Sequence, residues 1–335
     1  MIKVAINGFG RIGRLVFRIM QNDSNFDIVA INDLTDAEDL AYLLKYDTAQ
    51  GRYKINSITS DGEYLIVDGK RIRVYSETNP ENLPWAELEV DEVFECTGRF
   101  TAKEDAMAHI KAGAKKVIIS APAKGDVKTI VYNVNEDILD GSEEIISAAS
   151  CTTNCLAPVL NVLETTFGIK KGYMTTVHAY TNDQTLLDLN HKKGYKSRRG
   201  RAAASNIVPT STGAAEAIGK VIPSLDGRFK GNALRVPTIT GSMIDLVLEL
   251  NTKVTKEEVN AAFIKNQNAT LVVTKDPIVS SDTIGSSVGA LVDLLLTDVL
   301  DVDGGLVKVV AWYDNEMGYS YQMVRTAKKL GEFIR

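Results

Sequence analysis

A glycine-rich turn near the start of the chain is the strongest constraint on its fold. The apolar run 2–6 leads into Asn7–Gly13 (NGFGRIG), and apolar residues at helical spacing follow the turn. A second apolar run, 27–32, ends at Asp33, twenty residues after the last glycine of the turn. A G-x-G-x-x-G motif between a strand and a helix, with an acid at this distance, is typical of a dinucleotide-binding fold.

Each glycine of this turn has a physical role in such a fold. Gly8 allows the tight turn, Gly10 lets the backbone approach a pyrophosphate, and Gly13 lets the helix pack closely on the strand. The N-terminus of the helix then faces the phosphate charge. Asp33 is placed to accept hydrogen bonds from the adenosine ribose hydroxyls, and its charge would repel a 2′-phosphate. We therefore predict that the cofactor is NAD rather than NADP.

The rest of the first 150 residues continues the alternation of strands and helices. Asp68-Gly69 lies between two strand-like runs and predicts a hairpin turn. Thr101 and Glu104 predict a capping box at the start of a helix. Strands that alternate with helices predict a mostly parallel, doubly wound sheet.

Ligands on doubly wound sheets bind at the carboxyl ends of the strands. The loops at Asp33, Thr97-Gly98 and Ser120 each follow a strand-like run, so they are candidate cofactor contacts. Simple turn chemistry is an equally good explanation for any one of them. Cys96 falls at the end of such a run, and we interpret it as a core residue.

Chain length, net charge and cysteine content limit the class of protein. A chain of 335 residues exceeds one typical core, so two domains are expected. The net charge of -5 argues against general binding to nucleic acid or to anionic membranes. Three irregularly spaced cysteines fit a reducing cytosol rather than a disulfide framework. The N-terminus shows no basic-then-apolar leader and no stretch is apolar enough to span a membrane, so we expect a cytoplasmic protein.

The segment 150–155 (SCTTNC) has the features of a reactive cysteine site. A strand-like run at 145–149 precedes it, and apolar residues at helical spacing follow it. Ser150 is a plausible N-cap, which places Cys151 at the positive end of a helix dipole, where a thiolate is favoured. The alternative is a small buried hydrophobic residue. We predict that Cys151 is a nucleophile and that Cys155, one turn later in the apolar stripe, is core.

His178 is the best candidate for a base that acts on Cys151. It ends a strand-like run at 172–177, whereas His109 falls in a helical pattern and His191 in a charged loop, where surface roles suffice. In a Cys–His pair the sulfur attacks and the imidazole moves the proton. A zinc site is not expected, because Cys151 and Cys155 lack a second ligand pair at zinc spacing.

A long irregular stretch, 181–209, carries many basic residues. The stretch is compatible with a solvated surface, a nucleic-acid patch or a site for a small phosphorylated substrate. Ser211-Thr212-Gly213 opens a helical pattern and offers an anion site, which favours the phosphate interpretation. Arg235 interrupts an apolar run and needs an anionic partner, for which a substrate phosphate is one candidate. The basic residues of the stretch are Lys192, Lys193, Lys196, Arg198, Arg199 and Arg201.

Five segments of the sequence resemble those of phosphorylating glyceraldehyde-3-phosphate dehydrogenases. The resemblance runs the full length of the chain, and the Ser-Cys-Thr-Thr-Asn-Cys motif is highly specific. The overall pattern is similar to the bacterial glycolytic type. The matching segments are 7–14 (NGFGRIGR), 149–158 (ASCTTNCLAP), 211–215 (STGAA), 234–237 (LRVP) and 312–316 (WYDNE).

The resemblance implies an α/β protein in which a Rossmann-type doubly wound parallel sheet is joined to an α+β catalytic domain with a mostly antiparallel sheet. Residues 1–150 would form the NAD-binding domain, and the C-terminal helix at 316–335 would pack back on it. Residues 151–315 would form the catalytic domain. The family also implies a homotetramer, with the basic loop at a subunit interface.

The resemblance also implies roles for individual residues. Cys151 would be the nucleophile and His178 the proton acceptor that activates it. The implied cofactor site comprises Gly8, Gly10, Arg11, Ile12, Gly13, Asp33, Ser120 and Asn315, with the backbone of Arg11 and Ile12 on the pyrophosphate and Asn315 on the nicotinamide carboxamide. Thr181 and Arg235 match the pocket for the substrate's own phosphate, and Ser150, Thr152, Arg199, Thr212 and Gly213 match the site for inorganic phosphate.

The reaction that follows is the NAD-dependent oxidative phosphorylation of D-glyceraldehyde 3-phosphate to 1,3-bisphosphoglycerate in glycolysis. Cys151 would form a thiohemiacetal, His178 would remove its proton as hydride leaves for NAD⁺, and phosphate would cleave the thioester. No nucleic acid, membrane or metal is expected. Two alternatives remain: an erythrose-4-phosphate dehydrogenase, whose thioester is hydrolysed, and an NAD-binding thiol sensor or binding module.

Overall fold

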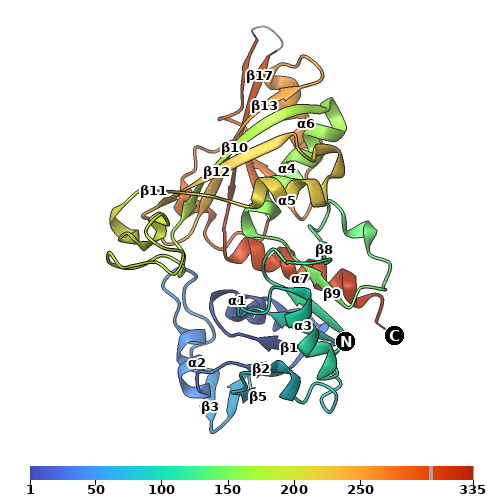
Figure 1. Ribbon diagram of the computed structural model, residues 1–335, viewed down its shortest axis with the longest axis vertical. Helices are drawn as coiled ribbons and strands as arrows, with labels where there is room; N and C mark the ends of the chain where they lie inside the picture. Colours follow the sequence, from blue (N-terminus) through green and yellow to red (C-terminus); the bar gives the residue numbers. More distant parts are fainter. Residues whose placement is uncertain (302–304, 335) are drawn as a thin grey trace. The chain divides into compact units, whose positions relative to one another are not determined.

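The computed structural model describes residues 1–301 and 305–334, and the chain divides into two compact units (Figure 1). The first unit comprises Met1–Ser150 with Ser320–Arg335, and the second comprises Cys151–Tyr319. Each unit contains its own sheet. Within the described ranges, no helix has the length and apolar character needed to cross a bilayer.

The sheet of the first unit has the order β3-β4-β5-β2-β1-β6-β7-β9-β8. Only β4 is antiparallel to its neighbours, and every other pair is parallel. The strands are β1 (Ile2–Asn7), β2 (Phe26–Asn32), β3 (Ile58–Asp61), β4 (Tyr64–Val67), β5 (Lys70–Tyr75), β6 (Glu92–Glu95), β7 (Lys116–Ile119), β8 (Lys128–Thr129) and β9 (Ile145–Ser147). The helices are α1 (Arg11–Met20), α2 (Ala37–Lys45), α3 (Lys103–Lys111) and, from Ser320 onward, α7 (Met317–Gly331).

The parallel register brings the carboxyl ends of the central strands together. Asn7 at the end of β1 pairs with Asn32 of β2 on one side and with Glu95 of β6 on the other, and Glu95 pairs with Ile119 of β7. Most positions of the central strands are buried and most of these are apolar, as expected for a sheet covered on both faces. The polar residues that follow the strands therefore lie along one edge.

Local predictions for the first unit have mixed outcomes. The hairpin at Asp68-Gly69 is confirmed, since both residues have positive φ (50° and 82°) and Val67 pairs with Lys70. The capping box of Thr101 and Glu104 is wrong. The N-cap of α3 is Ala102, so Thr101 lies one residue too early, and no side chain of the described residues caps this helix.

The sheet of the second unit has the order β11-β12-β10-β13-β17-β15-β14, with β16 paired to β17. Two pairs, β10–β12 and β14–β15, are parallel, and the other pairs are antiparallel. The expected mostly antiparallel second sheet is therefore confirmed. The strands are β10 (Ile169–Ala179), β11 (Val208–Thr210), β12 (Phe229–Val236), β13 (Ser242–Leu250), β14 (Leu271–Thr274), β15 (Ala290–Asp293), β16 (Asp298–Leu300) and β17 (Leu306–Tyr313).

Helices α4 (Cys151–Phe167), α5 (Ala214–Val221) and α6 (Lys256–Lys265) cover one face of this sheet (Figure 1). The alternation along β13 explains the packing: Ile244, Leu246 and Leu248 are fully buried, whereas Val247 between them is 41% exposed on the other face. A capping box of Thr255 and Glu258 opens α6. The N-terminus of α4 lies at the end of β10, and this placement builds the site.

Candidate active site

Cys151 and His178 are in contact. Cys151 is the first residue of α4, His178 is the penultimate residue of β10, and the Sγ of Cys151 lies 3.3 Å from Nε2 of His178. Nδ1 of His178 lies 2.6 Å from the carbonyl oxygen of Ala179. A carbonyl oxygen only accepts, so Nδ1 carries the proton and Nε2 presents its lone pair to the sulfur. The imidazole is thus oriented to take a proton from the thiol.

Burial sets the resting charge of this pair. Burial and, to a smaller extent, the Arg235 guanidinium lower the pKa of His178 to about 3, which leaves a neutral imidazole that can accept a proton. Burial also raises the pKa of the Cys151 thiol, although Arg235 and hydrogen bonds from Thr152 oppose this rise. Burial of the sulfur therefore opposes the thiolate that the helix N-terminus is expected to favour.

Tyr313, at the end of β17, ties the two catalytic elements together. Its hydroxyl lies 2.9 Å from Oγ1 of Thr152 on α4 and 2.9 Å from Oγ1 of Thr176 on β10. Its ring meets that of His178 edge-on at 5.9 Å between centroids. Sequence reasoning assigned no role to this tyrosine. Its position at the end of a strand, beside the candidate Asn315, was the available signal.

Arg235 lies beside His178 on the neighbouring strand. Its Nη1 donates to Oγ1 of Thr181 at 2.7 Å and to the carbonyl oxygen of Ala179 at 3.1 Å. Its Nε is buried and has no hydrogen-bond partner among residues 1–301 and 305–334. A buried guanidinium N–H without a partner is costly, and a phosphate oxygen would satisfy it. The structure thus brings together Arg235 and Thr181, as the phosphate prediction requires.

Arg199 lies in a short helical turn, and its side chain reaches the segment that leads into α5. Its Nε donates to Oγ1 of Thr210 at 3.0 Å, its Nη2 donates to the carbonyl oxygen of Ser211 at 3.3 Å, and its Nη1 pairs with Asp183. The next residues, Thr212 and Gly213, precede the first turn of α5, where the N–H of Ala214 donates to Oγ1 of Thr212 at 3.2 Å. An arginine beside a helix N-terminus is a suitable anion site.

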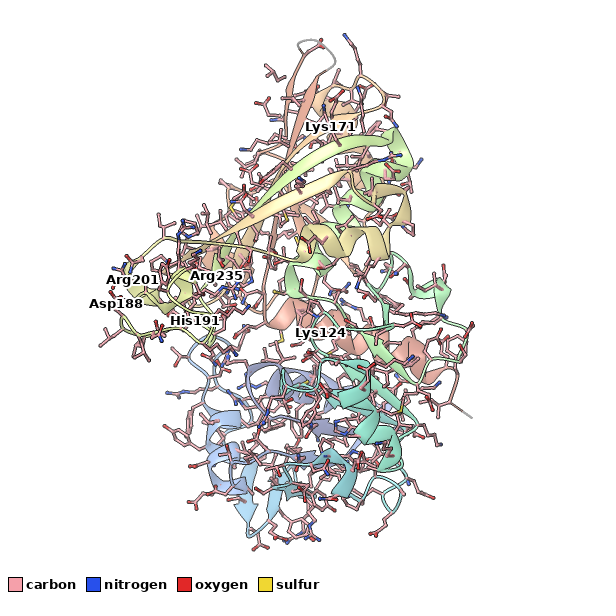
Figure 2. The ribbon with its side chains drawn as sticks, in the orientation of Figure 1. Lys124, Lys171, Asp188, His191, Arg201 and Arg235 are labelled. Carbon is pink, nitrogen blue, oxygen red and sulfur yellow. The ribbon has the colours of Figure 1, made fainter. Side chains whose placement is uncertain are left out.

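The structure also places Arg198 and Arg201, the two other candidate arginines of the basic stretch. Arg201 pairs with Asp188 and is largely exposed, and Figure 2 shows both side chains in the loop that also carries His191. His191 is 8% exposed, so the surface role expected for it is wrong. Arg198 belongs to the same short helical turn as Arg199. Of the three arginines, Arg199 is the one that bonds to the segment leading into α5.

Asp183 is a second residue that sequence reasoning missed. It accepts a hydrogen bond from Thr181 and pairs with Arg199. Although burial alone would raise the pKa of this carboxyl, the bonds from Thr181 and the nearby Arg199 and Arg235 cations keep it below its usual value. The sequence signal for Asp183 was the presence of an acidic residue inside a strongly basic stretch. Asp183 thus links the two candidate phosphate-binding groups, one around Thr181 and the other around Arg199.

Asn315 is buried and its side chain is fixed. Its Oδ1 accepts hydrogen bonds from Oγ of Ser242 at 2.9 Å, from the N–H of Gly241 at 3.2 Å and from Oγ1 of Thr240 at 3.3 Å. These donors fix the plane of the amide, so Nδ2 is the group that remains to bind a ligand acceptor. Such an amide suits a carboxamide, which offers both a donor and an acceptor.

A pocket of about 280 Å³ lies at the carboxyl edge of the first unit's sheet. At the position of a Cβ on Gly10, the N-cap of α1, no atom lies within 4 Å, so the backbone faces open space. A Cβ on Gly13 would lie 2.0 Å from the carbonyl oxygen of Gly8, and Gly8 itself has a φ of 90°. The three glycines therefore have the geometry expected of a cradle for a pyrophosphate at a helix N-terminus.

Asp33 lies in the same pocket. Its Oδ2 accepts from the N–H of Phe9 at 2.7 Å and its Oδ1 from the N–H of Thr35 at 3.0 Å, which fixes the carboxylate at the end of β2. The pocket thus fits a dinucleotide: a glycine cradle for the phosphates and a fixed carboxylate for a ribose. The residues that line it are Asn7, Gly8, Gly10, Asn32, Asp33, Leu34, Glu77, Thr78, Cys96, Thr97, Arg99 and Phe100.

Other predicted cofactor residues lie around this pocket. Arg11 and Ile12 form the first turn of α1, and Nη1 of Arg11 pairs with Oδ2 of Asp47 at 2.5 Å. Ser120 follows β7 and its side chain hydrogen-bonds Cys96. Cys96 lies just after β6 and lines the pocket, so its assignment to the core alone is wrong. Ser150 belongs to the first unit, and its predicted role with Thr152 stays a prediction.

No cluster of three or more His, Cys, Asp or Glu side chains suited to a metal ion occurs within the part of the chain that the structure describes.

Comparisons with known proteins agree in both halves of the chain. Residues 2–103 match the family model of the glyceraldehyde 3-phosphate dehydrogenase NAD binding domain, and residues 150–315 match that of the C-terminal domain. The chain is 57% identical to a glyceraldehyde-3-phosphate dehydrogenase of Clostridium pasteurianum over 100% of both chains. It is 56% identical to one of Clostridium acetobutylicum over 97% of each chain, and 55% identical to one of Streptococcus pyogenes serotype M1 over 100% of both.

Proposed function

Because the chain belongs to the glyceraldehyde-3-phosphate dehydrogenase family, we propose that Cys151 and His178 are the catalytic pair of its phosphorylating, NAD-dependent reaction. The activity itself is that of the glycolytic dehydrogenase. The observation that carries the assignment is the 3.3 Å approach of Nε2 of His178 to Sγ of Cys151, with the proton of the imidazole held on Nδ1.

The first step is addition of Cys151 to the aldehyde of glyceraldehyde 3-phosphate. A C–S bond forms, His178 takes the thiol proton, and that proton passes to the carbonyl oxygen, so that a thiohemiacetal results. His178 is then neutral again and its Nε2 holds the new hydroxyl. Bound NAD supplies a hydride acceptor. As the C–H hydrogen leaves with its electron pair, Nε2 of His178 receives the hydroxyl proton and a thioester remains on Cys151.

The thioester is cleaved by inorganic phosphate. A phosphate oxygen attacks the carbonyl carbon, the C–S bond breaks, and the product is the acyl phosphate 1,3-bisphosphoglycerate. Cys151 leaves as a thiolate and recovers a proton from His178. Covalent capture matters here because the thioester retains oxidation energy that a free acid would lose.

Two anion-binding groups serve the two phosphates. Arg235 and Thr181, next to His178, would hold the phosphate of the substrate, and the buried Nε of Arg235 is the donor that this phosphate satisfies. Arg199, Thr212 and Gly213, at the start of α5, would receive inorganic phosphate together with Thr152 and Ser150. Asp183 offsets part of the positive charge and orients Arg199.

NAD would bind in the pocket of the first unit. The backbone of Gly8, Gly10 and Gly13 with Arg11 and Ile12 would hold the pyrophosphate, and Asp33 the adenosine ribose. Ser120 would lie near the cofactor, and Asn315 would hold the nicotinamide carboxamide. In this assignment residues 1–150 form the NAD-binding domain with the C-terminal helix, 316–335, added to it, and residues 151–315 form the catalytic domain.

We also propose that the protein acts as a cytoplasmic homotetramer. Large apolar side chains on the basic stretch are strongly exposed in the single chain, including Leu186, Leu187, Leu189 and Tyr195 at 70–88%. Exposed apolar side chains gathered on one loop mark an interface. Sedimentation of the purified protein would decide the oligomeric state.

The reaction is tested by following NADH formation from glyceraldehyde 3-phosphate with and without inorganic phosphate. Phosphate should accelerate turnover strongly, and the acyl phosphate should be trapped with hydroxylamine. Oxidation that is equally fast without phosphate, and faster with erythrose 4-phosphate, would contradict the proposal.

A further inference from the structure

A series of hydrogen-bonded, buried polar side chains lies beside the dinucleotide pocket and has no part in the function proposed above. Trp85, in the segment between β5 and β6, donates from Nε1 to Nδ1 of His109 on α3 at 3.0 Å. Nε2 of His109 lies 3.1 Å from Oε2 of Glu95, the last residue of β6. Trp85 and His109 are 0% exposed and Glu95 is 1% exposed. The surface role expected for His109 from the sequence is therefore wrong.

The hydrogen bonds that join Trp85, His109 and Glu95 have one possible direction. An indole N–H only donates, so Nδ1 of His109 must accept, and the ring proton must be on Nε2, where it is donated to Glu95. Glu95 also receives Nδ2 of Asn7 at 2.5 Å and the N–H of Thr97 at 2.8 Å, as well as the Thr97 hydroxyl. The N–H donors of Asn7, Thr97 and His109 all require Glu95 to accept, and the Thr97 hydroxyl is placed to donate to it as well.

The Glu95 end of this series of buried side chains forms part of the wall of the pocket. Glu95 fixes both the N–H and the hydroxyl of Thr97, and Thr97 lines the pocket. This wall is tight, because a Cβ on Gly8 would lie 2.7 Å from the nitrogen of Thr97. A small displacement of Thr97 would therefore change the glycine turn itself.

Two further contacts couple the same residues to the pocket. Phe100 lines the pocket and its ring meets that of His109 edge-on at 6.3 Å. Asn7 accepts at Oδ1 from Nδ2 of Asn32 at 2.7 Å, and both asparagines line the pocket. His109 is thus connected to three pocket residues, to Thr97 and Asn7 through Glu95 and to Phe100 by direct ring contact.

A purely structural role is a poor explanation of this arrangement. A fully buried acceptor-only carboxyl group is costly unless donors surround it, and an apolar core would pack here without that cost. The donors are placed so that Glu95 holds a pocket residue on one oxygen and the His109–Trp85 pair on the other.

We propose that Trp85 and His109 are positioning residues for NAD, which act through Glu95 on Thr97 and on the glycine turn. The proposal rests on the assignment of this pocket to NAD. Loss of the Trp85 or His109 hydrogen bond should loosen the wall at Thr97 and weaken cofactor binding, while the thiol chemistry of the second unit stays the same.

The main test compares two tryptophan variants of the whole protein. Trp85→Phe keeps the ring stacked on His109 and removes the N–H. The matched control, Trp312→Phe, removes an indole N–H that donates to Oδ2 of Asp293 at 3.1 Å in the second unit.

From the loss of one hydrogen bond we expect Trp85→Phe to raise the calorimetric dissociation constant of NAD roughly threefold to tenfold. The KM for glyceraldehyde 3-phosphate should not change, and Trp312→Phe should not change NAD binding. An unchanged dissociation constant in Trp85→Phe, or an equal change in both variants, overturns the proposal.

A pair of histidine variants provides the test if Trp85→Phe does not fold. His109→Gln retains a donor for Glu95 and an acceptor for Trp85, whereas His109→Leu has a similar volume and retains neither. Affinity for NAD should be rescued in the Gln variant relative to the Leu variant, and equal affinities would contradict the proposal. Asp33→Asn separates the two hypotheses. Weaker NAD binding in Asp33→Asn with unchanged binding in Trp85→Phe overturns the positioning role alone, whereas unchanged binding in both variants overturns the assignment of the pocket and the positioning role with it.

Discussion

Nε2 of His178 faces Sγ of Cys151 because the other ring nitrogen is tied to the backbone one residue further along. The tautomer of the base is therefore fixed by the strand itself and needs no carboxylate partner. Burial lowers the pKa of the imidazole to about 3 and raises the pKa of the thiol, which favours the neutral form of each group.

Replacement of the nucleophile should abolish the reaction and spare the cofactor site. For Cys151→Ser we expect kcat to fall roughly 10⁴-fold or more, because a serine hydroxyl in this site is a far weaker nucleophile. NAD should bind with unchanged affinity in calorimetry. The matched variant Cys155→Ser alters a buried thiol one turn away and should retain most of the activity. A near-normal rate in Cys151→Ser would falsify the assignment.

Removal of the base should slow chemistry without removing the thiol. His178→Asn should lower kcat roughly 10²–10⁴-fold, the usual contribution of a positioned general base. Alkylation of Cys151 by iodoacetamide should also slow, because no base remains within reach of the sulfur. The same substitution at His191, whose ring bonds to Asp183 and Lys193 of its own loop, is the control. Alkylation as fast as in the native protein would show that His178 does not activate Cys151.

The guanidinium of Arg235 should recognise the phosphate of the substrate. Arg235→Lys keeps the charge but loses the fork of donors, and kcat/KM for glyceraldehyde 3-phosphate should fall roughly tenfold to a hundredfold. The rate with unphosphorylated glyceraldehyde should change much less. Arg228→Lys, which alters an arginine bonded to the carbonyl oxygen of Ile169, is the control. Equal losses for both aldehydes would argue against phosphate recognition by Arg235.

The charge of Asp33 should decide between the two dinucleotides. Asp33→Asn removes the charge that repels a 2′-phosphate, and the preference of kcat/KM for NAD over NADP should fall roughly tenfold or more. Asp36→Asn changes the same charge at the exposed N-cap of α2 and should leave the preference unchanged. If both variants keep the native preference, Asp33 does not contact the ribose.

Glu92 should make stability depend on pH. It is fully buried on β6, neither of its oxygens has a hydrogen-bond partner among the described residues, and burial raises its pKa well above the usual value. The folded state therefore keeps a proton that the unfolded state loses above about pH 4.3. This contribution to stability is complete below that pH and is lost as the pH rises toward the folded-state pKa, at about 1.4 kcal/mol per unit.

Glu92→Gln should therefore stabilise the protein at pH 8 relative to the native chain, and the gain should disappear near pH 4. Melting temperatures across this range provide the measurement. Glu89→Gln is the neighbouring control, since Glu89 is exposed and paired with Lys3, which lowers its pKa. A difference between Glu92→Gln and the native protein that does not vary with pH would rule out this account.

The sequence was sufficient for features that depend on local order. The glycine turn and Asp33 lie within one strand–helix–strand unit, and the helix start at Cys151 follows from the pattern around it. These features were therefore predictable from spacing and residue type alone. The resemblance supplied the roles of Thr181, Arg199 and Arg235, which spacing alone left open.

The sequence was insufficient where partners are far apart in the chain. Tyr313 meets Thr152 across 161 residues and Thr176 across 137, and no local pattern indicates such contacts. His109 was misinterpreted because a helical pattern does not show which face lies against Trp85 and Glu95. The burial that raises the pKa of the Cys151 thiol could not be predicted either, since desolvation depends on tertiary packing and not on position at a helix start.

Under the proposed roles of His178 and Arg235, the pairing of β10 with β12 limits how long a substrate can be. His178 and Arg235 are partners in the parallel register of these strands, so their Cα atoms are held side by side by main-chain hydrogen bonds. Sliding one strand by a single residue would turn its side chain to the opposite face of the sheet. A preference for a longer or shorter carbon backbone can therefore evolve here only through replaced side chains or remodelled loops, while the spacing between the proton acceptor and the bound phosphate stays constant.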